Sequence, residues 1–159
     1  MKTISLTNSS LVAIVDDEDY LAVSDRKWQL NKSSGAVQRC VRRNRKILTL
    51  YLARQLMGEP GNLVDHRDHN KLNNQRENLR VATRSQNGAN RRKQLSKTHS
   101  KFKGVSFFGG KWTAHIVVSQ KKRHLGVFDT EIEAARAYDA AAAYHFSEFA
   151  FTNGGIYQP

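Results

Sequence analysis

The sequence predicts an α+β chain with three structured sections: a small N-terminal α+β unit, a β-hairpin followed by a helix, and a three-stranded antiparallel sheet packed on one helix. Short apolar runs between polar turns predict the strands, and they alternate with helical patterns along the 159 residues. A tract rich in Asn, Asp and His fills the middle, and a basic stretch with few apolar residues follows it. These changes in composition place the expected sections at 1–60, 61–92 and 102–155, with a basic linker at 93–101.

The N-terminal section has the pattern of a small mixed unit. Two β-like runs flank a polar turn, and residues 16–25 read as a short helix with acidic residues in its first turn. Residues 46–58 begin as a strand and continue as a helix that ends at Gly58, with Pro60 beyond. Cys40 is the single cysteine, which excludes an intrachain disulfide and a multi-thiolate zinc site. We expect Cys40 to be a buried, small apolar side chain.

Positive charge is concentrated in one third of the chain. Of the 26 Lys and Arg, 12 lie between residues 78 and 128, where there is no Asp or Glu; the other 14 equal the 14 acidic residues in number, so this window holds the whole net charge of +12. Such a stretch repels itself, and a polyanion relieves the repulsion through counterion release. Nucleic acid is therefore the expected partner. Whether residues 1–60 also contact DNA stays open, although they include Arg39, Arg42, Arg43, Arg45 and Lys46.

A membrane partner is not expected. No apolar run approaches the roughly 20 residues of a membrane span. The first residues lack the apolar core of a secretory signal, and the basic stretch lacks an amphipathic helix with a broad apolar face.

The middle section carries an adjacent acid and histidine, Asp65 and His66, then Asn78-Leu79-Arg80, and then Asn87 on a helix that begins near Thr83. Residues 64–87 resemble the HNH endonuclease motif in the version found in phage and homing nucleases. The resemblance implies a β-hairpin and a helix that together hold one divalent metal, the ββα-metal arrangement. Asp65 and His66 match its first position, Asn78 the middle one and Asn87 the third.

These residue types suit phosphodiester hydrolysis. His66, with an ordinary pKa near about 6.5, accepts a proton from water at neutral pH. Asp65 and the amide oxygen of Asn87 are hard ligands suited to Mg²⁺ or Mn²⁺. Asn78 has a structural reading beside the catalytic one, because its amide suits tying loop backbone. Neighbouring strand residues point to opposite faces, so we expect the shared site of Asp65 and His66 at the strand's end.

The C-terminal section combines three short strand patterns with a helix that Thr130 and Glu133 cap and that runs to about His145. Residues 101–154 resemble the ethylene-response-factor type DNA-binding domain of plant transcription factors, versions of which are fused to HNH nucleases. The resemblance implies a sheet that lies in the major groove, backed by the helix. Period-2 alternation then turns Trp112, Ala114 and Ile116 toward the helix.

Two groups of residues are candidate DNA contacts. On and after the middle helix they are Arg84, Arg91, Arg92 and Lys93, for which a solvated helix face is the alternative. On the C-terminal sheet they are Lys103, Ser106, Lys111, Thr113, His115, Lys122 and His124. Family members usually have Arg at the positions of Ser106 and Val117 and Trp at that of His124. The loss of bidentate guanine contacts, worth about 1–3 kcal/mol each, predicts weak sequence preference.

Together these patterns predict a metal-dependent DNA endonuclease of the homing type, tethered to duplex DNA by its C-terminal section. One HNH site predicts a nickase that cuts one strand per binding event as a monomer, without an obligate protein partner. The phage resemblance places it in the cytoplasm of a bacterial host. The alternative is a non-catalytic DNA-binding regulator, and it is disfavoured because a decayed site has no physical reason to keep Asp65, His66 and Asn87 together.

Overall fold

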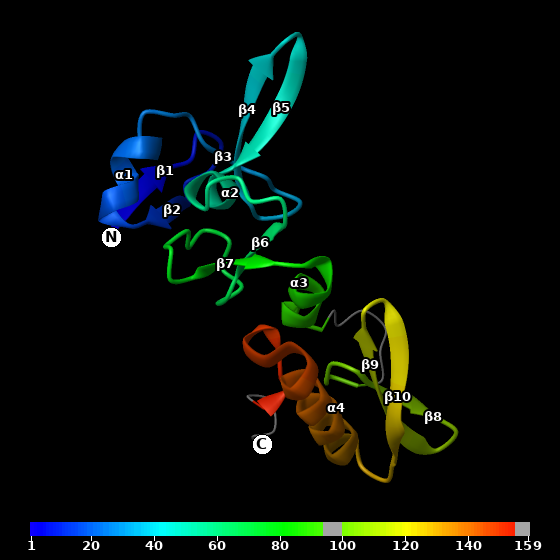
Figure 1. Cartoon of the computed structure of the whole chain (residues 1–159). Coiled ribbons are helices and arrows are strands. Elements are labelled where there is room, and N and C mark those ends of the chain that lie inside the picture. Colours follow the sequence, from blue (N-terminus) through cyan, green and yellow to red (C-terminus); the bar gives the residue numbers. More distant parts are fainter. Residues whose placement is uncertain (94–99, 155–159) are drawn as a thin grey trace. The chain divides into compact units, whose positions relative to one another are not determined.

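Helices and antiparallel sheets occur together in the computed structural model, which confirms the α+β class (Figure 1). The structure describes residues 1–93 and 100–154. It divides into two compact units, Met1–Thr83 and Arg84–Pro159. Most of the linker expected at 93–101 lies outside the described residues, and the expected section boundaries stay a prediction.

The first unit contains seven strands and two helices among the described residues. Their order is β1 (Lys2–Ser5), β2 (Val12–Val15), α1 (Asp17–Val23), β3 (Gln29–Leu30), β4 (Val37–Arg43), β5 (Lys46–Tyr51), α2 (Leu52–Leu56), β6 (Leu63–His66) and β7 (Leu79–Ala82). β1 pairs with β2, β4 lies between β3 and β5, and β6 pairs with β7, always antiparallel. The expected passage from strand to helix occurs between Tyr51 and Leu52.

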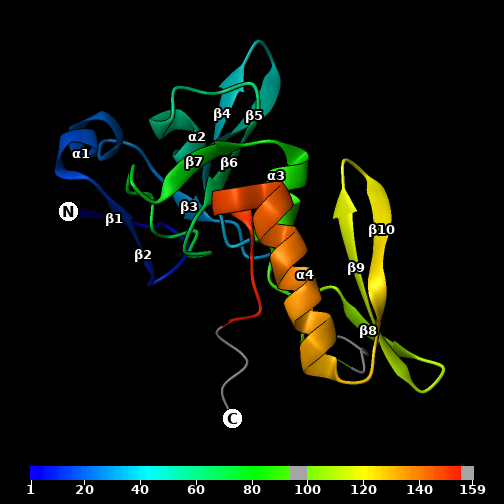
Figure 2. The same ribbon diagram turned by 60° about the horizontal axis from the view of Figure 1, so that its bottom comes forward.

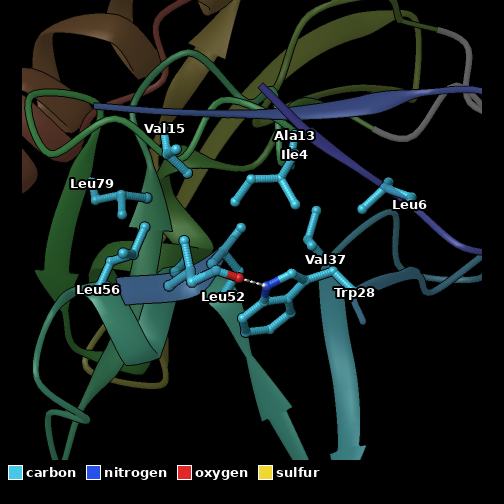
Figure 3. Close-up of a cluster of buried hydrophobic side chains, with 11 residues drawn as sticks. Ile4, Leu6, Ala13, Val15, Trp28, Val37, Leu52, Leu56 and Leu79 are labelled. Atoms are coloured by element: carbon cyan, nitrogen blue, oxygen red, sulfur yellow. Dashed lines mark hydrogen bonds between the residues drawn. The ribbon is translucent and has the colours of Figure 1, made fainter. Parts of the chain in front are cut away.

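One hydrophobic cluster of the described residues joins the early elements of this unit to the β6–β7 hairpin (Figure 3). Trp28 of this cluster is fully buried, and its indole N–H donates to the carbonyl of Val23 at 2.9 Å. Leu52 of α2 and Leu79 of β7 belong to the same cluster. The backbone of Ile14 in β2 also exchanges hydrogen bonds with the loop after β6, through Leu72 and Asn74. The hairpin is therefore anchored by both apolar packing and backbone pairing.

Acidic residues at the start of α1 also hold the loop between β6 and β7 in place. Arg76, in the loop between β6 and β7, binds the carboxylate of Asp19 through two nitrogens at 2.7 and 2.8 Å. Its backbone N–H donates to Asp16 at 2.7 Å, and this hydrogen bond lowers the pKa of Asp16. The acids that the sequence marks as a helix start thus also hold the loop.

The second unit contains α3 (Arg84–Asn90), β8 (Val105–Phe108), β9 (Lys111–Val118), β10 (Lys121–Phe128), α4 (Glu131–Phe146) and the 3-10 turn η1 (Ser147–Phe149). The sheet order β10-β9-β8 and the capping box of α4, formed by Thr130 and Glu133, are as predicted. Figure 2 shows α4 alongside this sheet. Ala114 and Ile116 of β9 are buried, and Val117, the next residue along the strand, is exposed. This confirms the predicted alternation.

The turn before the C-terminal sheet requires glycine at one position. Gly104, before β8, has a φ of +75°, and a Cβ there would lie 1.9 Å from the Tyr138 ring, so only glycine fits.

The prediction for Cys40 is wrong, because the cysteine is exposed. It lies on β4, where the hairpin extends beyond the core and both strand faces meet solvent.

Candidate active site

The β6–β7 hairpin carries the predicted acid and base at the end of its first strand. Asp65 lies opposite Arg80, and His66 lies opposite Leu79 as the last residue of β6. Asp65 is buried, with 7 % exposure, and His66 is half-buried. Both residues pair regularly with β7, and adjacent strand residues point to opposite faces. The shared site that the sequence places at the strand's end therefore stays a prediction.

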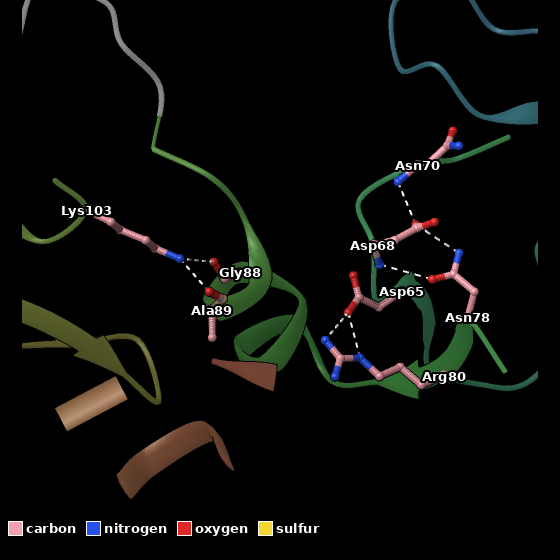
Figure 4. A network of polar contacts seen from close by, with 8 residues as sticks. All are labelled: Asp65, Asp68, Asn70, Asn78, Arg80, Gly88, Ala89 and Lys103. Carbon is pink, nitrogen blue, oxygen red and sulfur yellow. Dashed lines mark hydrogen bonds and ion pairs between the residues drawn. The ribbon is translucent and has the colours of Figure 1, made fainter. Parts of the chain in front are cut away.

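Asp65 is held by an arginine directly across the ladder (Figure 4). The Nε and Nη2 atoms of Arg80 both lie 2.9 Å from Oδ2 of Asp65. Both side chains are buried, with 7 % exposure each. A carboxylate offers about four acceptor positions over two oxygens, and both contacts from Arg80 are to Oδ2. Arg80 orients the carboxylate that the sequence assigns to the metal.

Asn78 ties the loop between β6 and β7, and Figure 4 shows its amide beside Asp68. Its Nδ2 donates to Asp68 at 2.9 Å and to the carbonyl of Asn73 at 2.7 Å, and its Oδ1 accepts the N–H of Asp68 at 3.0 Å. Burial opposes ionisation of Asp68, but hydrogen bonds from Asn73, Asn70 and Asn78 outweigh it and lower the pKa of Asp68. These bonds support the structural reading of Asn78; a catalytic role for it stays a prediction.

His66 has a neighbour that the sequence reasoning missed. Its Nε2 lies 3.4 Å from Oδ1 of Asn74, a side chain with 1 % exposure. Nδ2 of Asn74 donates to the carbonyls of Lys71 and Leu72, at 3.2 and 3.1 Å, so Oδ1 is the atom turned to the imidazole. An Nε2–H donor in this contact leaves Nδ1 as the proton acceptor. The one signal for such a partner in the sequence is the number of asparagines in the loop between β6 and β7.

Burial is the main influence on the charge of His66. It lowers the pKa of the imidazole, while Asn74 and the nearby carboxylates of Asp68 and Asp65 act in the opposite direction. The neutral form, which accepts protons, is therefore the form that the site favours at neutral pH.

Asn87, the third predicted motif residue, lies half-buried on α3 in the second unit. The C-terminal end of α3 is fastened within that unit. The Nζ of Lys103 donates to the carbonyls of Gly88, Ala89 and Arg91, and the N–H of Phe151 donates to Ala89 at 3.2 Å. A shared ion between Asn87 and Asp65 stays a prediction.

Comparison with known proteins places these residues in a family. A family profile described as HNH endonuclease matches residues 53–89, which include Asp65, His66, Asn78 and Asn87. A protein of Acanthamoeba polyphaga mimivirus described as an uncharacterized HNH endonuclease is 35% identical over 146 residues, covering 89% of this chain and 74% of the relative. This chain belongs to the HNH endonuclease family. It is accordingly a nuclease, and DNA is the expected substrate.

A second similarity covers about a third of this HNH endonuclease. The APETALA2-like protein 2 of rice, in both the indica and japonica subspecies, is 47% identical over 57 residues. That match covers 34% of this chain and 13% of the plant protein. In the part of the nuclease that the structure describes, no helix is long and apolar enough to cross a membrane.

Several predicted DNA contacts of the nuclease lie exposed on the second unit. They are Arg84, Arg91, Arg92, Ser106, Lys122 and His124, while Thr113 and His115 are half-buried. Ser106 and Thr113 lie opposite each other with their hydroxyls 2.8 Å apart, and His115 lies opposite His124. Arg84 and His115 also line one cleft of about 630 Å³ in this unit.

Three predicted lysine contacts have acceptors within the protein. Besides Lys103, the Nζ of Lys93 donates to the carbonyls of Phe102 and Val105 at 2.7 and 3.1 Å, and Lys111 pairs with Asp129. Burial, with the charge of Arg91, lowers the pKa of Lys103 to about 8. DNA contact by these lysines would require an exchange of partners. Within residues 1–93 and 100–154, the exposed side chains of Arg84, Arg91 and Arg92 have no such partner to exchange.

Among the described residues, no group of three or more His, Cys, Asp or Glu is arranged around a metal position. The ligand set expected from the sequence is of a different kind, since it combines one carboxylate with one amide. Hard oxygen donors of this type fit Mg²⁺ or Mn²⁺ rather than tightly held zinc.

Proposed function

We propose that this HNH endonuclease is a metal-dependent enzyme that nicks duplex DNA and is anchored to it by its C-terminal sheet. The observation that carries the proposal is the half-buried His66 at the end of β6, with Nε2 directed to Asn74 and with Asp65 as its neighbour. A neutral imidazole of this kind suits a general base that takes a proton from water.

Asp65 and Asn87 would hold the metal, with Arg80 orienting the carboxylate. When bound, Mg²⁺ or Mn²⁺ would offset the charge that develops on the phosphate. With one carboxylate and one amide in its ligand set, the protein leaves the ion with excess positive charge for phosphate oxygens. His66 meanwhile removes a proton, and the buried Asp65–Arg80 pair stabilises the strand that presents it.

The metal assignment is tested by the dependence of plasmid cleavage on Mg²⁺ concentration. We expect supercoiled plasmid to become nicked circles before linear DNA appears, and EDTA to stop the reaction. Asn87→Ala is expected to raise the Mg²⁺ concentration for half-maximal cleavage by at least about tenfold, equivalent to about 1.4 kcal/mol. Gln86→Ala, which removes a neighbouring amide from the same helix, is the matched control. An unchanged metal dependence in Asn87→Ala would remove Asn87 from the ligand set.

The C-terminal sheet is proposed as a sequence-tolerant anchor that uses the exposed contacts on α3, β8, β9 and β10. The resemblance of residues 101–154 to the ethylene-response-factor type domain supports DNA binding, and Ser106, Val117 and His124 replace the residues that would read bases. Titrating salt against binding to matched and scrambled duplexes checks this tolerance. We expect a steep salt dependence with modest discrimination, and a specificity ratio above about 10⁵ would contradict it.

The homing role, the monomeric state and the cytoplasm of a phage-infected bacterium are proposals that rest on the resemblance to phage and homing nucleases. A single catalytic site per chain predicts one cut per binding event. Linear product that forms at the same rate as nicked circles would point instead to two active sites acting together.

A further inference from the structure

The β4–β5 hairpin extends beyond the core of the first unit as a two-stranded ribbon (Figure 1). Its register runs from Gln38 opposite Tyr51 to Arg43 opposite Lys46. Asn44 and Arg45 form the turn with φ values of 49° and 62°, as a tight two-residue connection requires. Every residue from 42 to 49 is exposed. We name residues 39–50 the β4–β5 arm.

The end of the arm is strongly basic. Four of its five residues from 42 to 46 are cationic, namely Arg42, Arg43, Arg45 and Lys46. In the described part of the chain none of these four side chains has an ion-pair partner. The sequence also contains no Asp or Glu between residues 26 and 58. No neighbouring carboxylate along the chain therefore offsets this charge.

Stability of the fold does not account for this arrangement. Arg43 and Lys46 lie directly opposite each other, and like charges in cross-strand pairs are destabilising. Ile47 and Leu48 add exposed apolar surface beside the charges, with exposures of 75% and 41%. A two-stranded ribbon with solvent on both faces has little to hold it together. A polyanionic partner would relieve the repulsion and cover the apolar side chains.

Alternation along the strands places cations on both faces of the arm. Arg42 and Ile47 form a pair on one face, and Arg43 and Lys46 form the next pair on the other. A ribbon inserted into a DNA groove meets phosphates along both walls, so both faces need cations. The major groove, about 12 Å wide, admits a two-stranded β-ribbon.

We propose that the β4–β5 arm enters the major groove of the DNA substrate and forms a DNA contact in addition to the nuclease hairpin and the C-terminal sheet. This inference rests on the proposed function only in that the substrate is duplex DNA. The cations bind phosphates on the two walls, and Ile47 offers an apolar contact to base edges such as thymine methyl groups.

Charge neutralisation tests the arm in the His66→Ala background, where the DNA stays intact. The variant Arg42→Gln, Arg43→Gln, Arg45→Asn, Lys46→Gln keeps a residue that tolerates positive φ at the turn. The matched control removes four other exposed charges of the first unit, through Lys2→Gln, Arg26→Gln, Lys27→Gln and Lys32→Gln.

We expect the arm variant to bind duplex DNA at least tenfold more weakly and to lose about 2–4 from the slope of log affinity against log salt, at about 0.9 per phosphate contact. The control is expected to change the slope by less than about 1. Equal effects in the two variants, or none in either, would overturn the proposal.

The single exposed cysteine offers an independent readout, because Cys40 lies on the arm itself. An iron chelate attached there is expected to cut both DNA strands by hydroxyl radicals wherever the protein is bound, and Cys40→Ser treated in the same way is expected to give no cuts. Absence of cutting by the chelate-labelled protein under conditions where it binds the duplex would overturn the inference. Duplex binding without plasmid cleavage by the unmodified protein would instead contradict the proposed function and leave the arm's contact intact.

Discussion

Replacing His66 by alanine is expected to lower kcat for DNA cleavage by about 10²–10⁴-fold, the usual contribution of a positioned general base. The physical reason is that no other side chain is assigned to take the proton from water. Asp65, on the same strand as His66, stays paired with Arg80 of β7 in this variant. Single-turnover cleavage of a plasmid at saturating Mg²⁺ measures the effect. Affinity for duplex DNA is expected to stay within about twofold, because the imidazole carries no lasting charge in the neutral form.

His69→Asn is the matched control, because it removes a nearby histidine from the loop that follows β6. His69 has a φ of 64°, and asparagine tolerates that conformation. The control is expected to cleave at close to the normal rate. If His66→Ala and His69→Asn lowered kcat equally, loop structure rather than proton transfer would explain the loss, and His66 would not be the base.

Replacing Arg80 by methionine is expected to lower the free energy of unfolding of the first unit by about 3–5 kcal/mol, the usual cost of leaving a buried charge without its partner. Arg80 and Asp65 are both buried, and two guanidinium nitrogens meet one carboxylate oxygen at 2.9 Å. Methionine fills similar space but cannot compensate the carboxylate.

Denaturant titration followed by tryptophan fluorescence measures this loss. The chain has two tryptophans, so Trp112→Phe leaves Trp28, which is fully buried in the first unit's core, as the single reporter. The double variant Asp65→Leu, Arg80→Met is expected to recover most of the stability, because an apolar pair replaces the ion pair. Arg26→Met, which breaks an exposed pair with Asp25, is expected to cost less than about 1 kcal/mol. An equal loss in Arg80→Met and Arg26→Met would contradict the prediction.

Sequence patterns were sufficient for the features that depend on near neighbours in the chain. The capping box of α4 needs residues three positions apart, and the alternation of β9 needs positions two apart. The Asp65–His66 pair and the assignment to the HNH endonuclease family were likewise predicted from a short motif. β6 does end at His66, and the shared site that we expect there, because adjacent strand residues face opposite sides, stays a prediction.

Such patterns do not predict contacts between residues that lie far apart in the sequence. Arg80 meets Asp65 because of the register of β6 on β7, and Asn74 reaches His66 because of the loop between them. Lys103 has the sequence context of a DNA contact, yet its ammonium binds the last carbonyls of α3. The exposure of Cys40 likewise depends on how far the β4–β5 arm extends beyond the core.

By itself, therefore, the sequence determined the α+β class, the nuclease family and the identity of the candidate acid and base, because these are encoded in local periodicity and in a compact motif. Tertiary structure alone decided which residues orient the candidate acid and base, and which lysines form hydrogen bonds within the protein. It also decided that the basic β4–β5 arm extends beyond the core. The physical reason is that strand register and loop geometry arise from packing over the whole unit, where Trp28, Leu52 and Leu79 share one core although they lie far apart in the chain.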